Sequence, residues 1–275
     1  MASQGSATEH AKNDVVSELI SAVESGKYDA VKSILQGHNF PVQDILNAVT
    51  ETGRMIYDFN LHREERTETI WHTALTWACH KANNMIRVTD KHVEALEIVR
   101  LLLDHGADPG AKGFSQGRHI IPLHMAVSQG NLALTRVLLE GKAVVDQTDD
   151  DGRSALHIYG MVNRCFIKFD PARLEILIKH KADVNLQDRH GKTPLHNCMR
   201  HGYWQHHVTR SLLENGASAN IPDHSGEYPL HTAVNLEVID INIVQILLEG
   251  KASVNQTNHE GQSALHLCCS ENHRR

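Results

Sequence analysis

The sequence predicts an all-α solenoid, in which short helix-turn-helix units are stacked side by side and joined by hairpin-like finger loops. One observation is a tetrad of the form X-Pro/Ala-Leu-His, whose copies begin at Ile121, Ser154, Thr193, Tyr228 and Ser263. A second is spacing: a weaker copy has its leucine 48 residues before the next, and later leucines follow at 33, 39, 35 and 35 residues. A third is length, because 275 residues without a Pro-, Gly- or Ser-rich linker suit repeats that pack only on their neighbours.

The segment Asp188–Asn220 gives the clearest copy of the unit. It contains a polar turn closed by Gly191, the tetrad Thr-Pro-Leu-His, a second helix with Leu212, and a terminal Gly216. A period near 33 residues with T-P-L-H-x-A in the first helix is the signature of the ankyrin repeat. The chain therefore resembles the ankyrin-repeat family, and the resemblance implies stacked helix pairs with finger loops.

Each residue type of the tetrad has a physical reason to be there. Thr or Ser can cap the free N–H groups of a helix, and Pro is tolerated in the first turn because its missing donor has no helical partner. Leu supplies the inward-facing anchor. In the family the histidine bridges neighbouring groups, so the resemblance implies a structural role for His124, His157, His196, His231 and His266.

The amino-terminal part departs from the repeat. Residues 1–14 are small and polar, and we expect a disordered tail there. Residues 15–37 place apolar side chains on helical faces around Gly26 and predict a degenerate capping repeat. Residues 38–69 carry no repeat signature and are expected to form an irregular insertion.

The remaining chain follows the repeat to its end. Together with the capping repeat and the insertion it is expected to form a single ankyrin-repeat domain at 15–275. The expected units are a repeat with a long insertion at 70–110, repeats at 111–147, 148–186, 187–221 and 222–256, and a partial repeat at 257–275. The partial repeat has room for one helix only. Either the native chain ends at Arg275 or the sequence is a piece of a longer protein, and the second interpretation is favoured.

Three lysines occupy a position where the family has glycine. Lys142, Lys181 and Lys251 each follow a second helix. A left-handed backbone at a residue with a side chain costs about 1 kcal/mol. The pattern predicts strained helix ends, unless these helices end in a different way.

Composition limits the classes of function. A net charge of −6 argues against nucleic acid, which favours a basic surface. Five cysteines without C-x-x-C pairing fit free thiols in a reducing compartment. No apolar run is long enough for a membrane span. We therefore expect a monomer in the cytoplasm, with the nucleus as a second compartment, and no membrane or nucleic-acid partner.

The sequence offers little for catalysis. Phosphate-loop, G-x-S-x-G, H-E-x-x-H and kinase motifs are absent, so neither an enzyme nor a cofactor is expected. The densest group of metal-ligand types is His201, His206 and His207 near Cys198. Adjacent histidines on a helix point in different directions, and no metal site is expected from this group.

Asn185 carries a separate signal. It follows a leucine, an acid and an apolar residue at spacings that resemble sites of asparaginyl β-hydroxylation in ankyrin proteins. The simpler alternative is that the side chain hydrogen-bonds the finger backbone.

The family resemblance implies a concave partner-binding surface made of finger tips and first-helix positions. Trp204 is added as an aromatic anchor candidate, and Trp77 is a second anchor candidate that could equally belong to the core. The surface positions are Asp150, Asp151, Arg153, Met161, Arg189, His190, Lys192, Arg200, His201, His224, Ser225, Glu227, Asn235, His259, Glu260 and Gln262.

The resulting hypothesis is a non-catalytic adaptor that binds a protein partner through this surface. Two alternatives remain open. One is a cytoplasmic inhibitor that sequesters a transcription factor. The other is the targeting or regulatory arm of a longer enzyme, such as a ubiquitin ligase, kinase or effector.

Overall fold

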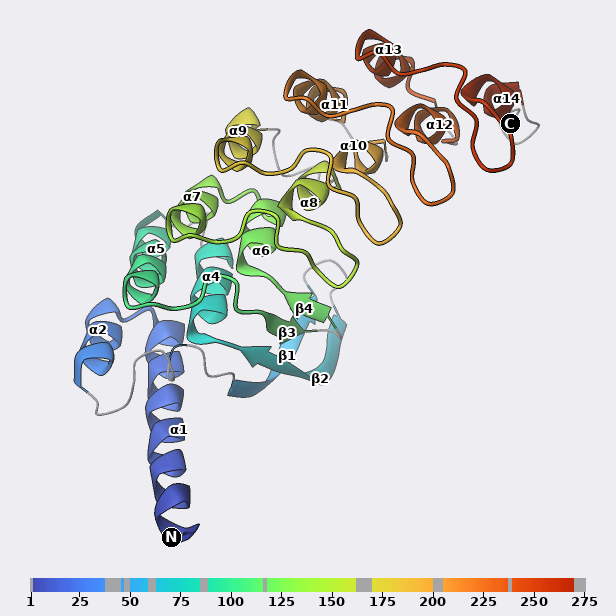
Figure 1. The fold of residues 1–275 in the computed structure, drawn as a ribbon. Coiled ribbons are helices and arrows are strands. Elements are labelled where there is room, and N and C mark those ends of the chain that lie inside the picture. The colour runs from blue at the N-terminus through green and yellow to red at the C-terminus, as the bar shows by residue number, and fades with distance from the viewer. Residues whose placement is uncertain are drawn as a thin grey trace. The chain divides into compact units, whose positions relative to one another are not determined.

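The computed structural model describes residues 2–37, 46, 50–58, 63–84, 89–115, 118–161, 170–199, 205–236 and 239–269. The chain divides into two compact units, Met1–Val144 and Val145–Arg275, and each is described by itself. Helices hold more than half of the described residues, and the first unit adds a four-stranded sheet (Figure 1). The single domain expected at 15–275 stays a prediction.

The first unit begins with two helices, α1 (Ala2–Ser25) and α2 (Tyr28–Gly37). Between them Gly26 adopts a φ of 70°, a left-handed conformation that glycine accepts without steric cost. The apolar positions predicted for the capping repeat are buried: Leu19, Val23, Val31 and Leu35. The helix pair expected within 15–37 is therefore present.

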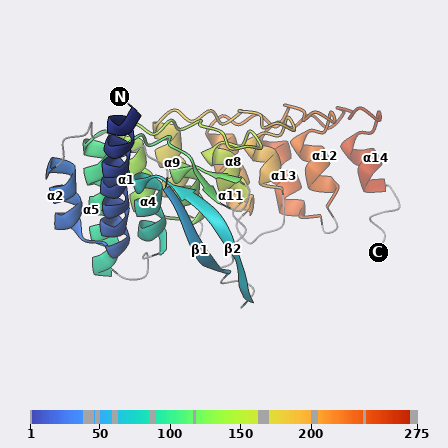
Figure 2. The same ribbon diagram turned by 90° about the horizontal axis from the view of Figure 1, so that it is seen from below.

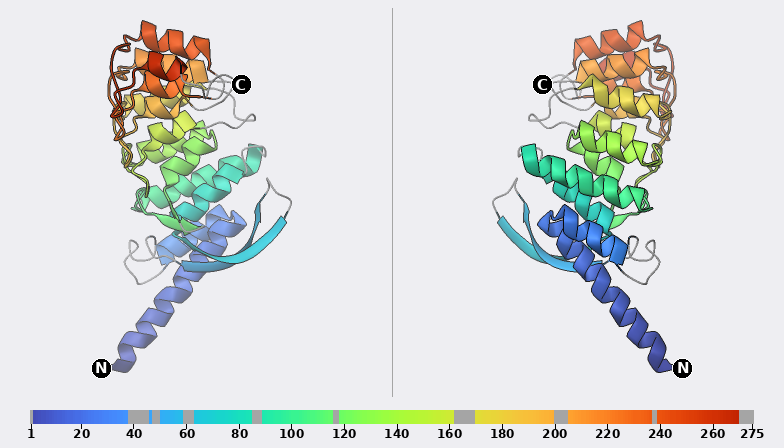
Figure 3. Two further views of the ribbon diagram at one scale, coloured as in Figure 1. Left: turned by 90° about the vertical axis from the view of Figure 1, so that its right-hand side faces the viewer. Right: turned by 90° about the vertical axis from the view of Figure 1, so that its left-hand side faces the viewer.

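The structure differs from the disordered tail expected at 1–14, because α1 already begins at Ala2. Figure 3 shows the first half of α1 extending away from the other helices of its unit. Ala, Glu, Gln and Lys in this stretch have high helix propensity, and lengthening an existing helix costs little because each added residue gains a hydrogen bond. A polar composition disfavours a buried core, but it does not prevent a neighbouring helix from continuing through the segment.

A β-hairpin occupies much of the irregular insertion expected at 38–69. Strands β1 (Thr50–Asp58) and β2 (Arg63–His72) pair antiparallel, with a register shift between Met55 and Ile56. Figure 2 shows the two strands as a long ribbon. Threonine, isoleucine and aromatic residues favour strands, and residues 50–72 contain several of them.

The hairpin joins a second one to form a sheet in the order β1-β2-β3-β4. Strands β3 (Gly113–Ser115) and β4 (Arg118–Ile120) pair within the finger loop between Ala107 and Pro122, and Trp71 of β2 pairs with Phe114 of β3. The repeat expected to start near Ile70 therefore has its first helix only after β2. The all-α class is confirmed for the helix pairs, and the sheet is an addition to it.

Two helix pairs complete the first unit: α4 (Ala74–Asn84) with α5 (Thr89–Asp104), and α6 (Pro122–Ser128) with α7 (Leu132–Glu140). Helices α4 and α5 have 11 and 16 residues, against 7 and 9 for α6 and α7. Part of the long insertion expected in 70–110 thus lengthens the helices themselves. The core of these pairs includes Leu75, Leu102, Leu123 and Leu138.

The second unit repeats one arrangement of helices. Helices α9, α11 and α13 form one row, and α8, α10, α12 and α14 form another from which the finger loops extend (Figure 1). The helices are α8 (Ala155–Met161), α9 (Pro171–Lys179), α10 (Pro194–Asn197), α11 (Gln205–Glu214), α12 (Pro229–Val234), α13 (Ile241–Glu249) and α14 (Ala264–Cys269). The repeats expected at 148–186, 187–221 and 222–256 each provide a helix pair, and the partial repeat provides α14.

The tetrad leucines lie in the core, with one exception. Leu156, Leu195 and Leu230 are at most 4% exposed, whereas Leu265 of α14 is 71% exposed. Helices α8, α10 and α12 each contact the next helix of their row. No described helix follows α14.

The tetrad histidines join one repeat to the next, as the family resemblance implied. In His196, Nδ1 accepts a hydrogen bond from the Thr193 N–H at 3.0 Å, and Nε2 donates to the carbonyl of Glu227 in the next finger at 3.0 Å. His157 repeats this geometry, with Nε2 at 2.9 Å from the Lys192 carbonyl. His231 repeats it with the Tyr228 N–H and the Gln262 carbonyl. A structural role is confirmed for these three.

This geometry requires a neutral ring. Nδ1 must keep its lone pair to accept the backbone N–H, while Nε2 must carry the proton that it donates to a carbonyl. Burial lowers the pKa of His157 and of His196 below their usual value because a buried ring resists charge, although the bond to the next carbonyl opposes this effect.

The three lysines of the helix ends adopt the left-handed conformation that the sequence predicted. Lys142, Lys181 and Lys251 have φ values of 67°, 65° and 64°. The Lys142 N–H bonds the Leu139 carbonyl at 3.1 Å, and the following N–H bonds the Leu138 carbonyl at 2.9 Å. This is a Schellman cap, in which glycine is the usual left-handed residue.

We predict that Lys142→Gly, Lys181→Gly and Lys251→Gly each stabilise the protein by about 1 kcal/mol, because glycine relieves the left-handed strain. In a chain of this size the change corresponds to a rise in thermal midpoint of about 2–4 °C. Thermal unfolding followed by circular dichroism measures it.

Gly216 is the matched control, since it occupies the same cap position with a φ of 89° and an added Cβ would meet no atom within 4 Å. Gly216→Ala should therefore lower the midpoint by a similar amount through backbone strain alone. Unchanged midpoints in all three lysine variants would show that these caps are not strained.

Acidification from pH 7 to pH 5 should lower the free energy of unfolding. His157 and His196 have lowered pKa values in the folded state, so the unfolded chain binds protons more readily once the pH falls below about 6.5. The contribution of the two histidines to the free energy of unfolding is complete above that pH, and it is lost as the pH falls towards their folded-state pKa. Urea unfolding at both pH values measures the loss.

The double variant His157→Gln, His196→Gln provides the comparison. It should be less stable at pH 7 but should lose less stability between pH 7 and pH 5, because the other histidines are common to both proteins. An equal loss in both proteins would contradict the role given to these rings.

Candidate functional site

The finger tips of the second unit are built on one repeated turn. The fingers of this unit are numbered in chain order from the one that contains Asp149. In the second finger, Oδ1 of Asp188 accepts the N–H groups of His190 and Lys192 at 2.8 and 2.9 Å. The Asp188 N–H bonds the Lys192 carbonyl, and the Gly191 N–H bonds the Asp188 carbonyl. The same four bonds form around Asp149, Asp223 and Asn258.

Each tip is hydrogen-bonded to the next through the backbone. The glycine of the turn makes this approach possible: a Cβ on Gly191 would lie 2.6 Å from the backbone nitrogen of His224, and the φ of 77° also favours glycine. The bonds are Arg189 N–H to Asp151 carbonyl at 3.0 Å, His224 N–H to His190 carbonyl at 2.9 Å, and His259 N–H to Ser225 carbonyl at 3.2 Å.

Asparagine side chains form a second ladder at the base of the fingers. Asn185 donates to the Gly216 carbonyl at 3.2 Å and accepts the Ser218 N–H at 2.8 Å. Asn220 makes the corresponding bonds to Lys251 and Ser253. The simpler alternative for Asn185, a hydrogen bond to the finger backbone, is therefore what the structure contains, and β-hydroxylation of this residue stays a prediction.

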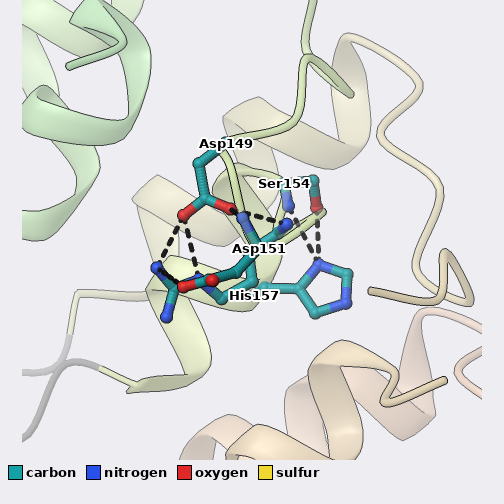
Figure 4. Close-up of polar contacts among 5 residues, drawn as sticks. Asp149, Asp151, Ser154 and His157 are labelled. Carbon is teal, nitrogen blue, oxygen red and sulfur yellow. Dashed lines mark hydrogen bonds and ion pairs between the residues drawn. The ribbon is translucent and has the colours of Figure 1, made fainter. Parts of the chain in front are cut away.

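The first tip is less acidic than its sequence suggests. Arg153 contacts Asp149 at 2.7 Å and Asp151 at 2.8 Å, so one guanidinium compensates part of two carboxylate charges (Figure 4). Burial raises the pKa of Asp149, but the hydrogen bonds and the charge of Arg153 outweigh it and leave the pKa below its usual value. Ser154 and His157 lie beside this cluster and contact each other, with Ser154 Oγ at 2.9 Å from His157 Nδ1 (Figure 4).

The second tip presents cations to the surface. Arg189 and His190 are exposed, and Lys192 is half-buried. Among the residues that the structure describes, no acidic side chain forms an ion pair with Arg189 or Lys192. The difference in sign between the first two tips, predicted from the sequence, is therefore present but comes mainly from the second tip.

The structure brings most of the predicted surface residues to the tips or beside them. Met161 is the last residue of α8, and Asn235 is exposed directly after α12. Arg200, His201 and Trp204 lie outside the described residues. The predicted tip residues that are described are Asp150, Asp151, Arg153, Arg189, His190, Lys192, His224, Ser225, Glu227, His259, Glu260 and Gln262.

Trp77 is not a surface anchor. It lies in α4 with 3% exposure and stacks on the ring of His80 at 5.6 Å between centroids. Of the two readings left open for it, the structure supports the core position.

The group near Cys198 does not assemble as a metal site in the described part of the chain. Cys198 is buried in the first-helix row, where its Sγ contacts the Pro194 carbonyl at 3.3 Å. His206 and His207 lie in α11, and His201 is outside the described residues. No set of three His, Cys, Asp or Glu side chains suited to a metal occurs among the residues described.

The outer surface has a feature that the sequence did not indicate. A groove of about 440 Å³ lies along α11 and α13 and is lined by His206, Arg210 and Ile246, among others. Arg210 pairs with Glu249 across the two helices at 3.2 Å. The residues come from two repeats, so sequence spacing alone gives no sign of this groove.

Comparison with known proteins agrees with this geometry. A solved structure, the ankyrin-repeat domain of Bcl-3, described as a unique member of the IkappaB protein family, aligns with 93% of this chain and 95% of its own chain, at a TM-score of 0.64 and 21% identity. At that identity the likeness concerns the fold alone.

No described helix combines the length and apolar character needed to cross a bilayer.

Two curated relatives match over part of their length. One is the palmitoyltransferase AKR1 of Lachancea kluyveri, 34% identical over 43% of this chain and 15% of the relative. The other is the transient receptor potential channel pyrexia of Drosophila melanogaster, 31% identical over 48% of this chain and 12% of the relative. The chain thus spans less than a fifth of either relative.

The family model described as "Ankyrin repeats (3 copies)" matches residues 90–165, 123–223, 165–257 and 205–275. These overlapping matches cover both helix rows and all the finger tips described above. The chain therefore belongs to the ankyrin-repeat family.

Proposed function

We propose that this protein is a non-catalytic adaptor, which binds a protein partner through the finger tips of its second unit. Ankyrin-repeat domains generally bind proteins. The observation that supports the proposal best is the backbone ladder from Asp151 to His259, which holds successive tips in one register. A surface that is ordered before binding loses little entropy when a partner docks.

The polar character of the tips supports the same function. Interface rims carry hydrogen-bonding and charged groups that set specificity and the rate of encounter. Arg189, His190, His224 and Ser225 are exposed. The N–H groups of His190 and Ser225 bond the aspartate of their own turn, and those of Arg189 and His224 bond the preceding finger. Their side chains remain available to a partner.

The partial relatives support one alternative, the arm of a longer protein. In AKR1 and pyrexia the matched region is 15% and 12% of the whole, so the repeats there are one part of a larger chain. The other alternative, an inhibitor that sequesters a transcription factor, has no specific observation in its favour because the likeness to Bcl-3 concerns the fold alone.

Affinity capture from cell extract tests the adaptor function. The double variant Arg189→Glu, Lys192→Glu reverses the charge of the second tip and leaves every backbone bond of the ladder in place. A partner that binds through the tips should be lost, with at least about tenfold less protein recovered, because like charges at an interface oppose binding. Quantitative mass spectrometry of the captured proteins gives the ratio.

The matched control is Lys179→Glu, Lys251→Glu, which makes the same change of charge at exposed positions that follow or end the outer helices. It should capture the partner as the parent protein does. Equal recovery by all three proteins would place binding away from the tips, and equal loss in both variants would show a general effect of charge.

A further inference from the structure

Arg189, His224 and His259 form a row along the finger tips. Each is the residue after the Asp or Asn that organises its finger, and each donates its backbone N–H to the preceding finger. Their side chains lie over the preceding glycines: a Cβ on Gly191 would be 2.5 Å from Cδ2 of His224, and one on Gly226 would be 2.6 Å from Cδ2 of His259. Arg189 lies over the glycine of the first finger in the same way.

The row is rich in donors, whereas most carboxylates beneath it are already used. Arg189, His224 and His259 are all exposed. By contrast, Asp188 and Asp223 are buried and accept backbone N–H groups of their own fingers. Glu227 is half-buried, and Glu260 is the exposed acid nearest the end of the row. Among the described residues none of these three side chains forms an ion pair, although Asp150 and Asp151 lie in the tip next to Arg189.

The spacing of the row suits an extended chain. Packed helices lie about 8–10 Å apart, which sets the distance between successive repeats. A segment in the extended polyproline II conformation rises about 3.1 Å per residue with three residues per turn, so every third side chain lies on the same face, about one repeat apart. Acidic side chains at every third position would thus face successive members of the row.

We propose that the partner binds as an extended segment with Asp or Glu at every third position, and that Arg189, His224 and His259 each contact one of these carboxylates. Guanidinium and imidazole N–H groups match carboxylate oxygens as hydrogen-bond donors. Lys192, half-buried in the same tip as Arg189, adds positive charge at that end of the row. This inference rests on the proposed adaptor function and names the class of its partner.

Two fluorescent peptides of equal composition test the inference with the full-length chain. One carries three glutamates separated by Gly-Ser pairs, and the other carries three consecutive glutamates with the same Gly and Ser residues. Fluorescence anisotropy at low salt should give a dissociation constant about fivefold lower for the spaced peptide, since only that peptide reaches all three tips. The difference should shrink at high salt, because exposed charges are screened.

The triple variant Arg189→Ala, His224→Ala, His259→Ala should bind the spaced peptide about tenfold more weakly, as three exposed contacts are lost. The substitutions keep the backbone N–H groups, so the thermal midpoint should be nearly unchanged. The matched control Lys179→Ala, Lys181→Ala, Lys251→Ala removes three exposed lysines of the same unit and should leave the affinity as it was.

Equal affinity for both peptides would overturn the spacing, and equal affinity of the triple variant and the parent would overturn the site. If neither peptide binds while capture of a partner still depends on Arg189 and Lys192, the acidic segment is excluded and the adaptor function stands. If capture is also independent of the tips, both proposals fail.

Discussion

The second unit depends on hydrogen bonds that run from a side chain of one repeat to the backbone of the next. His157, His196 and His231 reach the carbonyls of the following fingers, and Asn185 and Asn220 reach both carbonyl and N–H groups at the finger bases. A single helix pair cannot bury its apolar face alone, so each repeat needs its neighbour. The side-chain bonds fix the register in which that neighbour docks.

The same register constrains the residues at the surface. Gly191 and Gly226 are required because the next finger passes within contact of where a Cβ would lie. The strained lysines lie at exposed caps, where a cost of about 1 kcal/mol each is tolerated because packing of the helix pairs stabilises the fold by much more. The close approach between repeats therefore constrains the residues of the finger tips, which is the surface proposed for partner binding.

The helix pairs could be predicted because their signals are local. The tetrad places Pro in the first turn, Leu inward and His at the bridge, and the left-handed lysines follow from their position after a helix. The joining of the two hairpins into one sheet could not be predicted in this way, because Trp71 of β2 pairs with Phe114 of β3 more than forty residues later. The exposed groove along α11 and α13 likewise joins residues of two repeats.

The sequence by itself indicated an ankyrin-repeat protein and a structural role for its tetrad histidines, which the structure confirms for His157, His196 and His231. Both signals are motifs that recur in each repeat. Only the tertiary structure decided that Arg153 compensates Asp149 and Asp151, that Trp77 belongs to the core, and that Arg189, His224 and His259 form one row. The physical reason is that charge compensation, burial and alignment depend on which residues the folded backbone brings together. The distances between those residues are set by packing between helices, strands and loops that are far apart in the sequence.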